Sequence, residues 1–340
     1  MLYIVQNMNN VRKLLENSNI TKEWPALASR ISYDEPMSAH TTFKIGGPAD
    51  CFARPRTRAE LSALIDFFTA NTIPVSVLGG GSNLLVADRG ILGAVISLAG
   101  FDAIERIDST PPAAPDALLV RSGAGVAMND LVEWCAARSF GGLERFAGLP
   151  GSVGGAVFMN ARCYETSVSD VFFRAECLYF RDGGYTIEER PFDPAEWDYK
   201  RSPFQWRSGP DPLRLGENAQ IVLSAVLHLK AGDERAIRSE METYVRDRAC
   251  KGHFRYPSAG SMFKNDRAFG KPSGKIIDEA GLCGLRIGDA QIAPWHGNIL
   301  VNVGNATASD VRALVDEVRR QVLEKTGFDL EPEVIMAGDW

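Results

Sequence analysis

Three consecutive glycines, followed by a serine and an asparagine, are the residues of this chain best suited to chemistry. The apolar run 73–78 leads directly into Gly79, Gly80, Gly81, Ser82 and Asn83. Without a Cβ, a glycine adopts positive φ easily and lets a ligand approach the backbone, while the hydroxyl and the amide add hydrogen-bond donors. Such a turn suits a pyrophosphate. Taken alone, the run is equally typical of a plain tight turn.

The spacing of these glycines excludes the common nucleotide motifs. It matches neither G-x-G-x-x-G nor G-x-x-x-x-G-K-[ST], because no lysine follows the turn. We therefore expect neither the standard dinucleotide fold nor a P-loop, but some other phosphate-bearing ligand.

A second glycine-rich turn lies in residues 149–156, after another predicted strand–helix unit. It contains Gly151, Ser152, Gly154 and Gly155. These residues suit the start of a helix whose free N–H groups face an anion. Two such turns on separate units favour a bound ligand over two coincidental loops.

Composition excludes several classes of function. The 340 residues carry 37 Lys and Arg against 43 Asp and Glu, a net charge of -6, so no overall basic field attracts nucleic acid or acidic membranes. The N-terminus has no basic segment typical of a signal peptide, and no apolar run reaches the roughly 20 residues that span a bilayer. The sequence predicts a cytoplasmic protein that binds a small molecule, without nucleic acid or membrane insertion.

The cysteines and histidines do not indicate a metal. Six cysteines lie far apart without a C-x-x-C pair, and four histidines are scattered. Free thiols are therefore expected rather than disulfides or a zinc site.

The elements that must position these turns alternate between helix and strand. Residues 1–36 resemble a polar N-terminal extension with a helix near 8–17, ending at Pro36. The sequence Thr57-Arg58-Ala59-Glu60 is a capping box that predicts a helix to about Asn71. Later strands are expected at 118–121, 175–180, 185–189 and 221–229, and a helix at 129–138.

A boundary is predicted at residues 231–233, and the remainder has the pattern of a compact α+β domain. It begins with a charged helix over 234–248 and continues with a short helix at 275–280 and a strand at 299–303. A last helix starts at Thr307 and ends at Gly327. Its apolar face consists of Val311, Leu314, Val315, Val318 and Val322.

Seven blocks, in order, make the chain resemble the UDP-N-acetylenolpyruvoylglucosamine reductase (MurB) family, whose members complete UDP-N-acetylmuramate for peptidoglycan. The blocks are residues 42–47, 78–85, 147–160, 199–202, 258–265, 281–288 and 330–334, with Asn302 between the last two.

The resemblance implies an α+β fold with two parts. Residues 37–230 would form a two-part FAD-binding domain of the vanillyl-alcohol-oxidase (PCMH) type, and residues 231–340 a smaller substrate-binding domain. Both glycine turns, together with Asn160, would hold FAD without a covalent link, and NADPH would recharge the flavin. The enzyme would be a UDP-N-acetylmuramate dehydrogenase, here expected to be a monomer of the form that lacks an additional substrate-covering loop.

The resemblance also assigns catalytic roles. Ser261 matches the family's proton donor, and Glu333 matches the acidic residue that acts on the enolpyruvyl carboxylate. Taken without the resemblance, Ser261 is an ordinary loop serine and Glu333 a solvated carboxylate. Glu331 shares a face with Glu333 by strand alternation, so only the motif selects between them.

One departure concerns the catalytic cation. Where the family has Tyr-Arg-x-Ser, this chain has Tyr199-Lys200-Arg201-Ser202, so a lysine occupies the register of the arginine. Lysine keeps the charge but not the bidentate fork. Lys200, Arg201 and Arg162 are the candidates for the cation, the last because residues 160–165 also depart from the family pattern.

The remaining candidates are contacts to the substrate. Lys264, Asn265 and Tyr199 are predicted to bind it, whereas Lys251 and His253 could meet its phosphates or simply lie on a solvated face. Two other classes stay open: a flavin oxidase of the same superfamily, which would lack Ser261, Lys264 and Glu333, and a catalytically silent binding protein.

Overall fold

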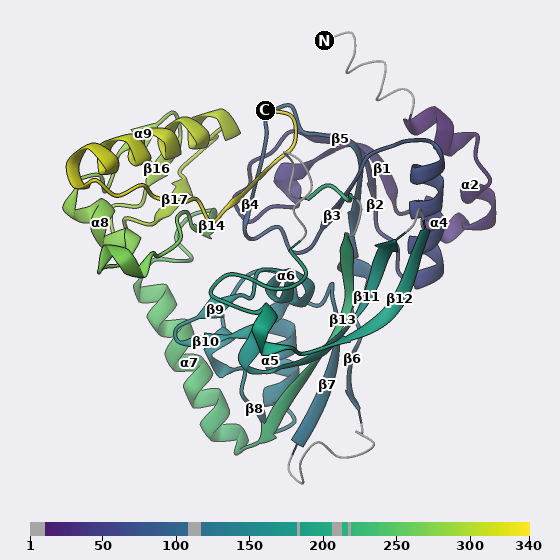
Figure 1. The fold of residues 1–340 in the computed structure, drawn as a ribbon, viewed down its shortest axis with the longest axis horizontal. Helices are drawn as coiled ribbons and strands as arrows, with labels where there is room; N and C mark the ends of the chain where they lie inside the picture. The colour runs from purple at the N-terminus through teal and green to yellow at the C-terminus, as the bar shows by residue number, and fades with distance from the viewer. Residues whose placement is uncertain (1–10, 108–116, 182–183, 206–212, 217–218) are drawn as a thin grey trace.

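The structure is a computed structural model that describes residues 11–107, 117–181, 184–205, 213–216 and 219–340. Three lobes surround a common centre, two containing a four-stranded sheet each and one containing a six-stranded antiparallel sheet (Figure 1). Mixed helix and strand content confirms the predicted α+β class.

The first lobe contains a four-stranded sheet in the order β1 (Ile31–Pro36), β2 (Pro48–Ala53), β5 (Ile91–Ser97), β3 (Val75–Leu78). The strands β2, β5 and β3 run parallel, and β1 pairs antiparallel with β2. Helix α4 (Arg58–Ala70) begins where expected, because Thr57 Oγ1 accepts a hydrogen bond from Glu60 N.

The predicted N-terminal extension packs onto this lobe. Residues 11–16 are helical, while the part of the expected helix before residue 11 lies outside the described residues. The short helices α2 (Ile20–Glu23) and α3 (Pro25–Ala28) follow. Leu15 and Leu27 are fully buried in the main core, and β1 is a strand of the sheet. Residues 11–36 therefore belong to the body of the lobe.

The second lobe is an antiparallel sheet in the order β12 (Gly184–Pro191), β11 (Phe172–Arg181), β13 (Gln220–Ala231), β7 (Ala117–Gly123), β6 (Ile104–Ile107). Helices α5 (Met128–Ala136) and α6 (Val153–Phe158) pack against it, and α6 lies near the centre of the molecule (Figure 1). The strands predicted at 118–121, 175–180, 185–189 and 221–229 and the helix at 129–138 are all present, with slightly different ends.

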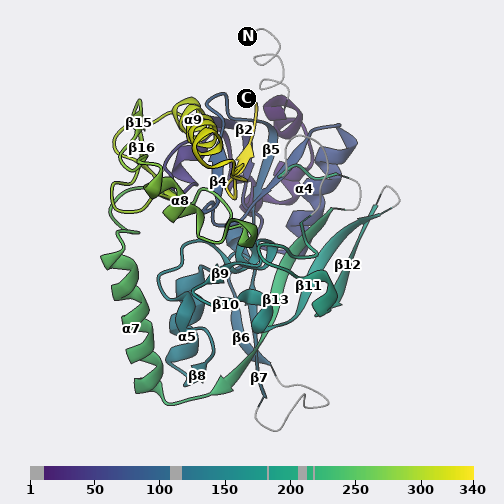
Figure 2. The same cartoon turned by 60° about the vertical axis from the view of Figure 1, so that its left-hand side comes forward.

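Helix α7 (Glu234–Cys250) leads from the second lobe to the third. Asp233 caps it, accepting from Ala236 N. The helix runs along the second lobe (Figure 2), where Ile237 and Met241 are buried in the main core and Arg238 forms an ion pair with Glu133. The predicted boundary at 231–233 therefore separates two elements but not two cores.

The third lobe contains the sheet β14 (Ser258–Ser261), β17 (Ile299–Asn302), β16 (Ala290–Ile292), β15 (Arg286–Ile287), with helices α8 (Ser273–Glu279) and α9 (Ala308–Thr326). Thr307 and Asp310 form a complete capping box on α9, and Gly327 ends the helix at φ 76°. The predicted apolar face is confirmed, since Val311, Leu314, Val315, Val318 and Val322 are all buried.

The third lobe is joined to the first by the carboxylate of Asp88 at the start of α9 and by the pairing of two strands. Asp88 accepts from the N–H groups of Ala308 (2.7 Å) and Ser309 (2.9 Å) at the start of α9. Strand β18 (Ile335–Ala337) pairs in parallel with β4 (Leu84–Val86), directly after the first glycine turn. The C-terminal segment is thereby brought beside that turn.

Shorter elements complete the described part of the chain. They are β8 (Phe140–Gly141), β9 (Arg162–Cys163), β10 (Thr166–Ser167) and the 3-10 helices η1 (Met37–Ala39), η2 (Leu98–Gly100), η3 (Glu144–Phe146), η4 (Val168–Asp170), η5 (Pro194–Glu196) and η6 (Arg267–Phe269).

Candidate active site

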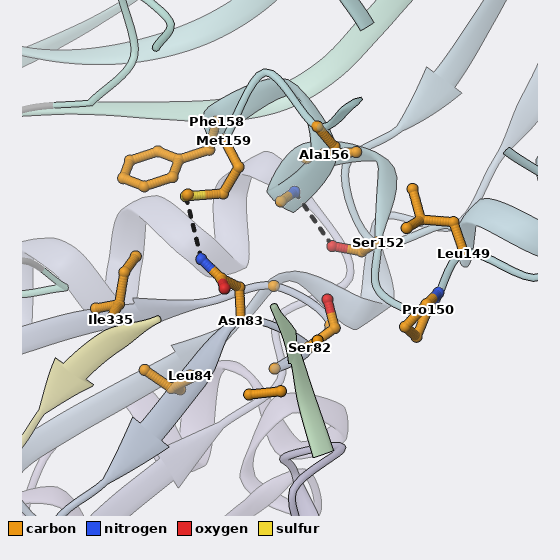
Figure 3. A pocket seen from close by; sticks show the side chains of 18 of the residues that line it. Ser82, Asn83, Leu84, Leu149, Pro150, Ser152, Ala156, Phe158, Met159 and Ile335 are labelled. Carbon is orange, nitrogen blue, oxygen red and sulfur yellow. Dashed lines mark hydrogen bonds between the residues drawn. The ribbon is translucent and has the colours of Figure 1, made fainter. Parts of the chain in front are cut away.

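A cavity of about 390 Å³ lies where the three lobes meet. Both glycine turns, helix α6, strand β14 and the segment before β18 contribute to its wall. Figure 3 shows Ser82 and Asn83 on one side of this space and Ser152, Ala156 and Met159 on the other. The two turns singled out in the sequence therefore face a single cavity.

The two glycine turns touch each other through their backbones. A Cβ at Gly80 would lie 2.5 Å from both Gly151 Cα and Ser152 N, closer than real Cβ atoms come. Gly81 has φ 60°, and a Cβ there would lie 2.0 Å from His40 O. Only glycine fits at these positions, so the run is a close backbone contact rather than an exchangeable surface turn.

The second turn starts helix α6. Ser152 is its N-cap, with Oγ accepting from Gly155 N at 3.3 Å, and Gly151 has φ 108°. Ser152, Gly154 and Gly155 line the cavity, whereas Gly151 contacts the first turn instead.

The first turn presents donors to the cavity. Within the described residues, the backbone N–H groups of Gly80, Gly81 and Ser82 donate to no acceptor. Asn83 differs, because its Nδ2 donates to Glu333 O at 3.1 Å. Unpaired N–H groups beside a glycine turn form an anion-binding concavity suited to phosphate oxygens.

Four predicted catalytic residues line the same cavity: Ser261, Lys200, Glu333 and Arg162. Lys200 Nζ lies 2.5 Å from Glu333 Oε1, and the two side chains are 15% and 8% exposed. Glu333 N donates to Met262 O at 2.7 Å, which ties Glu333 to the residue after Ser261. The strand end that bears Ser261 and the segment that bears Glu333 are therefore fixed side by side.

A tight two-residue turn presents Lys200. Asp198 and Arg201 exchange backbone hydrogen bonds at 3.0 and 3.1 Å, and Lys200 between them has φ 56°. Asn160 Nδ2 donates to Asp198 O at 2.9 Å, so the end of α6 holds this turn. The side chain of Asn160 is buried and does not line the cavity.

A second cluster, which includes Lys251 and His253, forms another part of the wall. Tyr164 OH donates to Asp247 Oδ2 at 2.7 Å, and Lys251 Nζ contacts the same oxygen at 2.6 Å. Arg248 Nη1 lies 3.2 Å from Cys163 Sγ, and its buried Nε has no partner among the described residues. Tyr164, Arg248 and Lys251 line the cavity, as does His253.

The charges of this cluster shift its pKa values. Burial, followed by the nearby Arg248, lowers the pKa of His253 to about 4, so its imidazole is neutral near pH 7. Lys251, followed by Tyr164, lowers the pKa of Asp247. Burial raises the pKa of the Cys163 thiol, against the opposing effect of Arg248 and Lys200. Cys163 is therefore a thiol, not a thiolate.

The described lining is positively charged. It includes Arg162, Lys200, Arg248 and Lys251 against the single carboxylate of Glu333. Such an excess attracts an anionic ligand in a partly enclosed space.

Other predicted residues lie outside this wall. Arg201 and Tyr199 are exposed. Lys264 Nζ pairs with Glu331 Oε1 at 2.6 Å, and Asn265 Oδ1 accepts from Ser273 N at the start of α8. None of these four lines the cavity, and their assignments stay predictions.

Two further findings concern metals and membranes. Within the described residues, no group of three or more His, Cys, Asp or Glu side chains is placed to hold a metal ion. Nor does this part of the chain contain a helix with the length and apolar character needed to cross a membrane. All six cysteines are free thiols.

Comparison with known proteins agrees with this geometry. Residues 49–186 match a family described as FAD binding domain, and residues 252–337 match the C-terminal domain of UDP-N-acetylenolpyruvoylglucosamine reductase. The enzyme of that name from Treponema denticola is 46% identical over 98% of this chain and 100% of its own length. The chain belongs to the UDP-N-acetylenolpyruvoylglucosamine reductase family.

Further relatives support the assignment. The reductase of Treponema pallidum is 42% identical over 89% of this chain and 92% of its own. The crystal structure of the reductase from Thermus caldophilus superposes with a TM-score of 0.67 at 34% identity, covering 89% of this chain and 97% of that one. The chain is thus an oxidoreductase with an FAD-binding domain, a C-terminal reductase domain and FAD as cofactor.

The residues of the cavity fit FAD. The unpaired N–H groups of Gly80, Gly81 and Ser82 suit its pyrophosphate, and the close backbone contact of the two turns leaves no side chain in that place. Leu78, Ala156 and Met159 add apolar surface to the same wall.

Proposed function

We propose that the protein catalyses the NADPH-dependent, FAD-mediated reduction of UDP-N-acetylglucosamine enolpyruvate to UDP-N-acetylmuramate, a step in peptidoglycan precursor synthesis. The observation that carries the proposal is the arrangement of Ser261, Lys200 and Glu333 around the cavity that both glycine turns line. The substrate is taken from the names of the relatives.

FAD, when bound, supplies the hydride, with NADPH as its reductant. The glycine turns bind its pyrophosphate and leave the remainder of the cavity for the substrate. A bound substrate would thereby meet Ser261, Lys200 and Glu333, all of which line that space.

Lys200 and Glu333 act on the enolpyruvyl group. Reduction of the double bond accumulates negative charge next to the substrate carboxylate, and the Lys200 ammonium stabilises that charge in a partly enclosed site. Glu333 Oε1 lies 2.5 Å from Nζ of Lys200, so the ammonium is already oriented before the substrate enters.

Ser261 supplies the proton that completes the reduction. Its Oγ donates to the carbon adjacent to the carboxylate, and a hydroxyl is acidic enough because its partner is an accumulating carbanion. Gly260, with φ 77° and nothing within 4 Å of a Cβ, sets the direction of the strand end that carries this hydroxyl.

The basic part of the wall binds the diphosphate of the substrate. Arg162, Arg248 and Lys251 supply the positive charge. Free thiols at all six cysteines fit a reducing compartment, which supports the cytoplasm as the location of this enzyme. We propose separately that it acts as a monomer.

Anaerobic stopped-flow spectroscopy tests the proposal. NADPH should bleach the flavin of the purified protein, and UDP-N-acetylglucosamine enolpyruvate should restore its absorbance in the absence of oxygen. A flavin that is reduced but not reoxidised by this substrate would contradict the proposed reaction, and a protein that binds no flavin would contradict the site.

A further inference from the structure

We infer that Gln205 and Asn83 are a pair of positioning residues that hold the main chain on either side of the Lys200–Glu333 ion pair. The inference rests on the proposed function and extends it to residues that touch neither charged side chain. Gln205 holds the lysine and Asn83 the glutamate, each through a backbone carbonyl.

The lysine side of the arrangement starts from a strained backbone. Lys200 has φ 56°, a conformation that a residue with a long side chain rarely adopts without support. Gln205 Nε2 donates to Lys200 O at 3.0 Å and supplies that support from outside the turn. The peptide orientation at Lys200, and with it the direction of the side chain, depends on this bond.

The glutamate side is held in a similar way. Asn83 Nδ2 donates to Glu333 O at 3.1 Å, while Glu333 N donates to Met262 O at 2.7 Å. Both main-chain polar groups of Glu333 are thus fixed, which sets the point from which its carboxylate reaches Lys200.

The two amides meet at one sulfur atom. Asn83 Nδ2 lies 3.7 Å and Gln205 Nε2 3.8 Å from Met159 Sδ, at the end of α6, and Figure 3 shows the first of these contacts. Because a thioether is a weak acceptor, the stronger hydrogen bond of each amide is the one to a carbonyl. The backbone on both sides of the ion pair, and the first glycine turn, are thereby connected to the same end of helix α6.

This arrangement predicts an effect on the chemical step rather than on binding. A displacement of about 1 Å in a positioned catalytic group costs on the order of 10²-fold in rate. Gln205 is not among the residues that line the cavity, so its loss leaves the contacts that bind substrate in place.

The test uses the flavin-loaded enzyme with Gln205→Met, which keeps the length of the side chain but removes the donor. Gln291→Met is the matched control, because Gln291 Nε2 donates to Gly284 O at 3.1 Å, the same kind of bond away from the cavity. Both variants are first compared with the wild type by circular dichroism and thermal melting.

Reoxidation by saturating enolpyruvyl substrate should slow roughly 10- to 100-fold in Gln205→Met, with the KM for that substrate and the rate of reduction by NADPH within about twofold. Gln291→Met should match the wild type in all three. Wild-type reoxidation in Gln205→Met overturns the inference, and so does an equal loss in both half-reactions. A wild-type enzyme that the substrate does not reoxidise overturns the proposed function instead.

A double variant tests whether Gln205 acts through Lys200. If Gln205 acts through Lys200, adding Gln205→Met to Lys200→Met should slow reoxidation by less than about twofold further. If the fold-reductions in reoxidation rate of the two single variants multiply in the double variant, Gln205 acts independently of Lys200.

Discussion

Two ion pairs of nearly equal burial have different surroundings in the two regions they occupy. Arg30 and Glu60 join the N-terminal segment to helix α4 at 2.6 Å, with side chains 14% and 8% exposed. Lys200 and Glu333 line the central cavity at 2.5 Å, with side chains 15% and 8% exposed. Burial alone therefore does not distinguish a structural pair from the pair that we propose acts in catalysis.

The difference lies in how many partners each pair has. Arg30 contacts both oxygens of Glu60 and donates to the carbonyls of Arg54 and Ala26, and Glu60 also accepts from Arg56 N at 2.6 Å. Within the described residues, the charged atoms of Lys200 and Glu333 contact only each other.

A saturated pair can only stabilise, whereas an unsaturated pair facing a cavity keeps donors and acceptors for a ligand. The same contrast separates the two halves of the cavity. The glycine turns form a wall that is largely backbone, whereas the part that we propose for the substrate carries charged side chains from distant segments.

The largest effect is expected from breaking the structural pair. Arg30→Met leaves the Glu60 carboxylate buried without its partner, and removing one member of a buried pair costs about 3–5 kcal/mol of unfolding free energy. Urea denaturation measures this loss. Flavin reoxidation per folded molecule should stay unchanged, and a slower rate would contradict the division into structural and functional pairs.

The converse variant, Lys200→Met, should affect chemistry more than stability. Loss of a single charge-stabilising group in an enclosed site slows reactions about 10²–10³-fold. Reoxidation of reduced flavin by the enolpyruvyl substrate is the rate to measure, with reduction by NADPH as the internal control. Since water in the cavity can solvate Glu333, unfolding free energy should fall by less than in Arg30→Met.

The dependence of stability on acid pH tests the role of the Arg30–Glu60 pair. Burial raises the pKa of Glu60, but the hydrogen bonds from Arg30 and Arg56 N outweigh it, and the folded pKa is lower than the ordinary value of 4.5. Its contribution is thus present above pH 4.5 and lost as the pH falls through the folded pKa. Denaturation curves below pH 4.5 should show a slope of at most about 1.4 kcal/mol per pH unit from this carboxyl. A slope of the same size in Arg30→Met would contradict the assignment.

The smallest effect concerns the basic part of the cavity. The pKa of His253 is about 4, below the ordinary 6.5 because of burial and then Arg248. The unfolded chain takes up this proton first, so stability decreases as the pH falls from about 6.5 towards 4. An NMR titration of the imidazole should give a midpoint near 4 that rises in Arg248→Gln, and an unchanged midpoint in that variant would exclude Arg248 as a cause.

Sequence patterns anticipated what is local. The glycine turns could be predicted because only glycine permits a positive φ and a close backbone contact. The capping residues Thr57 and Thr307 begin helices where expected. The apolar stripe of α9 follows from a 3.6-residue period.

Contacts between side chains of segments that are far apart in the chain could not be predicted from the sequence. Arg248 lies on a charged helix whose pattern is that of any solvated face, so its place in the cavity wall could not be predicted. The resemblance predicted Asn160 as a cofactor ligand, yet its amide holds the turn that bears Lys200. Nothing in the local sequence indicates that partner, because it is set by the packing of α6 against residues 198–201.

Single-turnover reoxidation of Glu333→Gln tests most directly whether the cavity pair serves chemistry. The variant keeps the shape of the side chain but loses the charge that orients Lys200. We expect reoxidation by the enolpyruvyl substrate to slow about 10²–10³-fold, with reduction by NADPH and the melting temperature close to the wild type. A variant that is reoxidised at the wild-type rate, or that loses stability without losing rate, would contradict the account.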